Sequence, residues 1–349
     1  MTRLVNFAIL TIIGGLAGLL AQHGSVATAG PTSPEIAGPE EVLRLFDIDE
    51  SVLQFFSDGE ALSRDELEPV YRLMYLLPRF DALQRHRWSV VPSDWGPLVA
   101  DPAAYRADMF ELLGRVTSIT RQALPAEAAR RFEFDYFEVL EIESTLDGRT
   151  LIVCTPQIPS KWPRDPVNQA VSCDAIFLKV GSEKAGQASL VFATNRIAWH
   201  PNEPDPAAKI SAGAALLGRY GMDVSRLDHV AHQRPLGTLD RDCFYELLWA
   251  VRRMPPQAIT RAVDDESLPV VRVLQTPTDE VGNVYRLRGT ARRALRIRVD
   301  EPDIQERFGI DHYYEIEFFT PLDQTLQLID PADGETRTYG NYPVTVCVA

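Results

Sequence analysis

The sequence lacks the short motifs by which many enzymes and metal proteins are recognised. It contains no GxSxG, HExxH, phosphate-binding loop or dinucleotide-binding glycine pattern. Its four cysteines, Cys154, Cys173, Cys243 and Cys347, form no CxxC pair or other metal-binding spacing. We expect small buried thiols, although a disulfide stays open in an exported chain. The sequence therefore predicts no catalytic residue, no metal ion and no cofactor.

Positive charge is scarce as well. The chain has 35 lysines and arginines against 49 aspartates and glutamates, which gives a formal net charge of −14. Such a field repels a phosphate backbone, and no surface dense in lysine and arginine is expected. These observations exclude nucleic acid as the predicted partner and favour a solvated acidic surface.

Long apolar runs are missing except at the N-terminus. Arg3 precedes an almost continuously apolar stretch, residues 4–21, and Ala27-Thr28-Ala29 follows with the small-x-small pattern of a signal-peptidase site. Residues 1–29 are therefore predicted to be a signal peptide. The alternative is an uncleaved anchor, because the apolar run lies at the lower limit of length for crossing a bilayer. Either way the rest of the chain is expected to be periplasmic or extracellular, after a linker at residues 30–42.

One stretch of the chain occurs twice. Residues 110–116 and 131–136 correspond to residues 285–291 and 307–312. The separation of Gly114 from Gly289 along the chain defines the repeat distance, and the other matched residues are separated by almost the same distance. Self-similarity at a fixed distance indicates repeated structural units. We predict a first module at residues 43–212 and a second at residues 213–349.

Each module is expected to begin with helices, at residues 43–80 in the first and 214–254 in the second. Tyr71 and Tyr245 lie close to one repeat distance apart, on matching apolar stripes of helical period. Upstream, the sequence around Asp47 is aligned with that around Asp223, at a similar distance.

The fold class predicted for both modules is α+β, with an OB-like β-barrel after the helices. The first barrel is placed at residues 108–200, where a glycine-bearing strand is followed by a hairpin at Asp147-Gly148 and two further strands. This order is typical of a five-stranded OB-type barrel, and another β-rich fold is the alternative. The expected strands are residues 110–120, 134–143, 150–155, 171–180 and 189–198.

The second barrel is expected to be partial, at residues 283–349. Its strands are predicted at residues 285–299, 312–320 and 325–329, and residues 342–349 are aligned with 168–175 through Cys347 and Cys173. This alignment places the last residues at the start of a fourth strand. The barrel is then either abbreviated or the sequence is truncated, and we favour truncation.

Four residues are the candidate ligand-binding positions of the first barrel: Tyr136, Lys161, Trp162 and Trp199. OB-type barrels bind ligands on the second and third strands and in the flanking loops, and aromatic platforms suit sugars or peptides. The alternative is that both tryptophans only cover the ends of the barrel.

Other polar residues are assigned ordinary roles. His229 and His232 lie three residues apart and Asp228 adds a carboxylate, but no fourth metal ligand is evident, so a solvated helix face is expected. Glu141 is predicted to be solvated because it alternates with apolar strand residues, as does its counterpart Glu317. Asp135 and Asp311 are predicted to be turn residues, with the arginines four positions upstream as salt partners.

The succession of residues 131–135, Ile-Pro-Ser-Lys-Trp at 158–162 and Arg-Ile-Ala-Trp-His-Pro at 196–201 resembles a group of uncharacterised exported bacterial proteins with duplicated modules. The resemblance spans residues 43–349. It implies the helix-plus-barrel architecture and no reaction.

These observations favour a non-catalytic binding or scaffold protein of the cell envelope, whose partner is an envelope protein or a glycan. The alternatives are an extracytoplasmic hydrolase of envelope polymers and a purely structural component. A hydrolase requires converging carboxylates or a histidine pair in a cleft.

The signal peptide can be tested directly. We expect N-terminal sequencing of the protein recovered from the envelope of an expressing bacterium to begin at Gly30, because signal peptidase cleaves after small residues such as Ala29. A chain that retains Met1 in the membrane fraction would instead establish the anchor.

Overall fold

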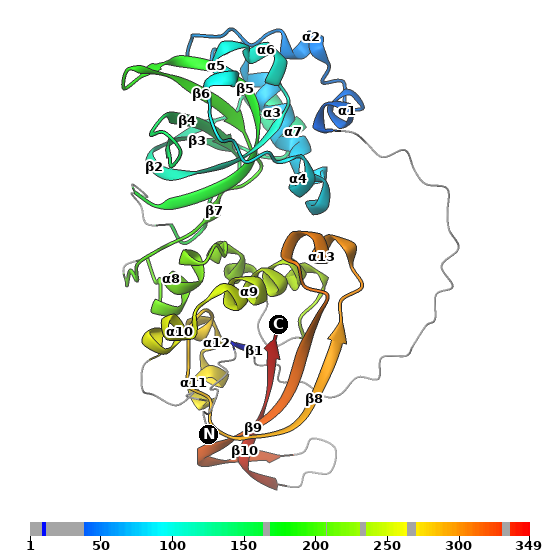
Figure 1. Ribbon diagram of the computed structural model, residues 1–349, viewed down its shortest axis with the longest axis vertical. Helices are drawn as coiled ribbons and strands as arrows, with labels where there is room; N and C mark the ends of the chain where they lie inside the picture. The colour runs from blue at the N-terminus through cyan, green and yellow to red at the C-terminus, as the bar shows by residue number, and fades with distance from the viewer. Residues whose placement is uncertain are drawn as a thin grey trace, which may run out of the picture. The chain divides into compact units, whose positions relative to one another are not determined.

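The computed structural model describes residues 9–11, 38–162, 168–206, 208–230, 235–263, 270–329 and 336–349 (Figure 1). The chain divides into two compact units. Residues 19–199 form the N-terminal unit; residues 200–349, with residues 1–18, form the C-terminal unit. Both combine helices with a sheet, so the α+β class is confirmed.

The module boundary expected at 212/213 lies inside the C-terminal unit. Residues 200–202 pack on the helix at Ala212–Arg219: Pro201 lies against Gly218, and Arg219 donates to the carbonyl of Asn202.

Short helices open the N-terminal unit. The helical apolar stripe that contains Tyr71 forms α3. This helix begins at Leu67, because Glu66 turns its carboxylate back to accept the backbone N–H groups of Ser57 and Ser63. The helices are α1 (Pro39–Arg44), α2 (Glu50–Leu53), α3 (Leu67–Leu76), η1 (Leu77–Arg79), α4 (Ala82–Trp88), α5 (Gly96–Ala100), α6 (Pro102–Tyr105) and α7 (Ala126–Phe132).

The strands of this unit form a sheet that closes on itself. They are β2 (Met109–Ala123), β3 (Tyr136–Ser144), β4 (Thr150–Thr155), β5 (Ala170–Lys184), β6 (Gln187–Ala193) and β7 (Ala198–Trp199). Their order is β2-β3-β4-β6-β5-β7, and β2 also pairs with β5. β2 pairs with β5 over residues 109–115 and with β3 over residues 114–123, so the two ladders meet at Gly114.

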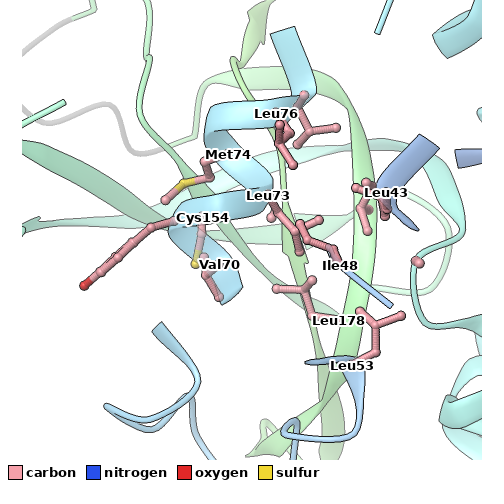
Figure 2. Packing of buried hydrophobic residues seen from close by; sticks show 14 of the residues in the cluster. Leu43, Ile48, Leu53, Val70, Leu73, Met74, Leu76, Cys154 and Leu178 are labelled. Carbon is pink, nitrogen blue, oxygen red and sulfur yellow. The ribbon is translucent and has the colours of Figure 1, made fainter. Parts of the chain in front are cut away.

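Two apolar clusters fill the N-terminal unit. One lies between α3 and the sheet, where Leu73, Cys154 and Leu178 pack together (Figure 2). The other fills the inside of the closed sheet and includes Leu112, Leu140 and Phe192. Alternation along β3 and β4 sends side chains to these two clusters in turn, which explains why both faces of the sheet are apolar there.

An ion pair is buried in the same unit. The ammonium group of Lys179 on β5 lies 2.7 Å from the carboxylate of Glu66, and both side chains are at most 2% exposed. Burial raises the pKa of Glu66, but Lys179 and the N–H groups of Ser63 and Ser57 outweigh burial and hold it below its usual value. The pair therefore ties β5 to the start of α3.

The helices of the C-terminal unit follow a similar order. They are α8 (Ala212–Arg219), η2 (Val224–His229), η3 (Thr238–Asp240), α9 (Arg241–Arg253), α10 (Pro256–Ala262), α11 (Val270–Gln275), α12 (Pro277–Glu280) and α13 (Pro302–Phe308). Asp223 caps η2 by accepting the N–H of Ser225, as Asp49 caps α2 by accepting that of Ser51. Asp223 thus matches Asp49 in its role as well as in its distance along the chain, and the alignment of Asp223 with Asp47 was wrong.

The sheet of the C-terminal unit consists of β8 (Thr290–Arg298), β9 (His312–Ile329) and β10 (Thr336–Val348), and the three-residue β1 (Ile9–Thr11) pairs with β10. The separate strand expected at residues 325–329 is wrong, because these residues continue β9 and pair with β10.

β10 also takes a different place from the one predicted. Cys347 lies opposite Glu315 as Cys154 lies opposite Val139, so Cys347 matches Cys154 and not Cys173.

Contacts within the two units recur at close to the repeat distance. α7 and α13 are matched in this way, and both end at a residue with a φ of 63°. A Cβ added at Gly114 would lie 2.4 Å from the carbonyl oxygen of Glu143 on the neighbouring strand. A Cβ added at Gly289 would lie 2.1 Å from the carbonyl oxygen of Phe319. The other matched contacts are the ion pairs Arg131–Glu68 and Arg307–Asp242 and the ring pairs Tyr75–Phe132 and Trp249–Phe308.

Most of the expected export segment lies outside the described residues. The exceptions are residues 9–11, which form β1. Among the helices in the described part of the chain, none combines the length and hydropathy needed to cross a membrane.

The buried ion pair gives the first stability test. We expect Lys179→Met to lower the free energy of unfolding by about 3–5 kcal/mol, because it leaves the Glu66 carboxylate buried without its counter-charge. Lys184→Met is the control on the same strand. Its partner Glu141 is one-third exposed, and its loss is expected to remove less than about 1 kcal/mol. Urea unfolding followed by tryptophan fluorescence measures both; equal losses would contradict the role of the buried pair.

Candidate functional site

The two tryptophans predicted to bind a ligand are partly or wholly enclosed. Trp199 is 2% exposed, its backbone pairs β7 with β5, and its indole N–H donates to Oε1 of Gln169 at 2.9 Å. Trp162 is half-buried and packs against the cluster inside the closed sheet. Its indole nitrogen is buried and has no hydrogen-bond partner among the described residues. Trp199 therefore offers no aromatic face to a ligand, whereas Trp162 offers part of one.

The other two predicted residues are exposed. Tyr136 opens β3 and is 42% exposed, and the guanidinium of Arg121 lies 4.0 Å from the centre of its ring. Arg121 also pairs with the buried carboxylate of Glu138 at 2.7 Å. Lys161 is exposed in the turn after β4. These side chains do not share one described surface with Trp199.

The carboxylates considered for hydrolysis do not converge. Asp135 is exposed, and Glu141 forms an ion pair with Lys184. Arg131 and Arg307 pair with Glu68 and Asp242, so the expectation that they pair with Asp135 and Asp311 was wrong.

The histidine pair is not completed as a metal site in what the structure describes. His229 is exposed at the end of η2, whereas His232 lies outside the described residues. Across the described ranges, no three His, Cys, Asp or Glu side chains are grouped to hold a metal ion.

Two acidic residues do face each other in the N-terminal unit. Glu111 on β2 lies directly opposite Asp174 on β5, and Asp174 accepts a hydrogen bond from Ser89 Oγ at 2.7 Å. Burial raises the pKa of Glu111, the charge of Asp174 raises it further, and His86 acts in the opposite direction. Ionisation of Glu111 therefore destabilises this ladder.

The edge of the C-terminal sheet is the most exposed described strand. β8 is hydrogen-bonded to β9 on one side, and its other side is unpaired in the described part of the chain. Only Leu295 and Ile297 of its nine residues are partly buried. The strand order of this unit, β1-β10-β9-β8, places β8 at one edge of the described sheet. The edge is therefore open to pairing.

This edge carries a dense group of arginines. Residues 284–299 contain six arginines and no acidic residue, in a chain whose net charge is −14. Four of them lie on β8 and are exposed: Arg292, Arg293, Arg296 and Arg298. The expectation that no arginine-dense surface exists is wrong here. A count of charge along the sequence, in place of the net charge, would have found it.

Nearby groups partly neutralise the charge of these arginines. Arg293 lies 3.3 Å from Glu317, Arg298 lies 2.7 Å from Asp300, and Arg292 stacks over the ring of Phe319. The two ion pairs are exposed, so solvent screens them and leaves the arginines able to exchange partners. The open edge thus combines backbone pairing groups with a positive surface.

No protein-family model matches the sequence, and no curated protein is similar enough to count as a relative.

The pair Glu111–Asp174 predicts a pH-dependent effect. A raised pKa in the folded state means that stability falls as pH rises from the unfolded pKa towards the folded one. We expect Glu111→Gln to stabilise the protein by about 0.5–1 kcal/mol at pH 7, and the gain to vanish near pH 4.

Urea midpoints at the two pH values measure this effect. Glu183→Gln, at an exposed position of β5, is the control and should change neither midpoint. A gain that is the same at both pH values would contradict the charge explanation.

Proposed function

We propose that the protein is a non-catalytic binding or scaffold protein of the cell envelope, built from two copies of one helix-plus-barrel module. The contacts that recur at the repeat distance support the duplication. The strand order β2-β3-β4-β6-β5, with β2 pairing back to β5, supports an OB-type barrel in the first module. In this proposal, the described strands β8, β9 and β10 correspond to the first three strands of the same barrel.

Export to the envelope rests on the N-terminal sequence. Arg3, the apolar run at residues 4–21 and the small residues before Gly30 support a signal peptide, with a membrane anchor as the alternative. Cleavage after Ala29 would remove β1 and leave the outer edge of β10 open, as the outer edge of β8 already is.

The open edge of β8 is the observation that carries the binding function. An exposed edge strand presents backbone N–H and C=O groups to which an extended segment of another protein can add as a further strand. The partner is therefore an extended protein segment. Main-chain hydrogen bonds supply affinity in this binding mode, and side chains at alternate positions supply specificity.

The arginines of β8 define the charge of that partner. Opposite charges facing each other across a ladder stabilise the pairing, and like charges destabilise it. A segment that adds to this edge is expected to carry acidic side chains against Arg292, Arg293 and Arg296. Electrostatic attraction also speeds the encounter at low salt.

The proposal is tested with a fluorescent peptide in which valine and glutamate alternate. We expect saturable binding at low salt by fluorescence anisotropy, and at least a fivefold weaker affinity for the double variant Arg292→Glu/Arg296→Glu, because it reverses charge along the open edge. The matched control, Arg64→Glu/Arg130→Glu, makes the same charge change at exposed positions of the N-terminal unit and should bind like the wild type.

Two competitors separate the partner classes. A polyuronate and a DNA oligonucleotide of equal charge carry the anionic groups without a backbone that can extend the sheet. Displacement of the peptide by either competitor as effectively as by unlabelled peptide would overturn the strand-addition function.

A further inference from the structure

Successive side chains of β8 face opposite sides of the sheet over Leu295–Arg298. Burial alternates along this stretch, because the two apolar residues are partly buried and the two arginines are exposed. Ile297 lies opposite Tyr313 in the ladder with β9, whereas Arg296 lies opposite Tyr314. Residues opposite each other share a face of the sheet, so the apolar residues and the arginines lie on different faces.

The apolar residues lie on the face that α9 covers. The ring of Tyr313 contacts those of Phe244 and Tyr245 on α9, with ring centres 5.3 and 6.3 Å apart. Val299 follows Ile297 on the same side of the strand and is fully buried in the cluster that contains Tyr245. This side of the open edge is therefore the margin of an apolar core, and an apolar side chain placed there would extend that core.

The other face of the edge is polar and positive. Arg298 lies opposite His312, whose ring centre lies 5.6 Å from that of Tyr314. Tyr314 is 41% exposed, and Arg296 opposite it is exposed as well. A carboxylate on this face gains a counter-charge that the apolar side of Leu295–Arg298 does not offer.

We propose that the β8 edge selects a segment of another protein in which apolar and acidic residues alternate opposite Leu295–Arg298, with the apolar ones on the α9 side. This inference rests on the proposed strand-addition function and deepens it. Leu295 and Ile297 determine the specificity, because arginines alone would accept any acidic chain. Arg293 limits the apolar side, since it lies two residues before Leu295 and forms an ion pair with Glu317.

The test compares two fluorescent peptides of the same length and composition. One alternates valine and glutamate, and the other repeats Val-Val-Glu-Glu, which places both residue types on both faces in every register. In anisotropy titrations of the full-length protein at low salt, we expect the Val-Val-Glu-Glu peptide to bind at least fivefold more weakly. An edge that recognises charge alone would bind the two peptides equally.

Substitutions on the apolar side identify the residues responsible. In Leu295→Thr/Ile297→Thr, threonine keeps the preference for a strand but removes apolar surface, so the difference between the peptides is expected to fall below twofold. The matched control, Leu239→Thr/Val271→Thr, changes exposed apolar residues of the same unit and should leave the difference unchanged. Circular dichroism and thermal unfolding check the folding of both variants.

Each outcome decides one level of the proposal. Equal binding of both peptides to the wild type would overturn the selection for alternation and leave strand addition to its own test. Absence of binding by either peptide would overturn both. A difference that persists in Leu295→Thr/Ile297→Thr would overturn the role assigned to these two residues.

Discussion

The bend of β2 at Gly114 is the constraint on which the N-terminal unit depends. A Cβ at this position would lie 2.4 Å from the carbonyl oxygen of Glu143, so only glycine lets β2 approach β3 while its first half turns towards β5. Closure follows from that bend, because one strand then serves two ladders. The closed sheet encloses one apolar cluster and presents a second to α3.

The same bend exists in the C-terminal unit but leads to a different result. Gly289 approaches Phe319 as closely as Gly114 approaches Glu143, and the register shift of β8 at Ala291–Arg293 matches that of β2 at Val116–Ser118. Without a described counterpart of β5, only the half of the strand that pairs with β9 forms a ladder. β8 therefore begins at Thr290, next to the bend, whereas β2 begins at Met109, well before it.

Local features of this fold could be predicted from the sequence, and long-range pairing could not. The repeat distance, the helical stripes and the positions of Gly114 and Gly289 can be found without knowing which strands pair. The match of Cys347 depends on the register between β9 and β10. These strands form a longer hairpin than β3 and β4, so distance along the chain does not identify the matching residue. Of the candidate site, Tyr136 and Lys161 proved exposed, but the burial of Trp199 follows from pairing with a strand distant in the sequence. Net charge concealed the arginines of β8, because an average over the chain does not report a local surplus.

The arginines of β8 also bear on which partner the open edge selects. An exposed edge strand can pair with its own copy on another molecule, and charged side chains are a common protection against that association. Two β8 strands in an antiparallel pair would bring the arginines of both copies together with no acidic residue from either strand, so this pairing is disfavoured. An acidic segment meets the opposite condition, because the same charges attract it. Specificity at this edge thus comes from one set of side chains that repels the wrong partner and attracts the right one.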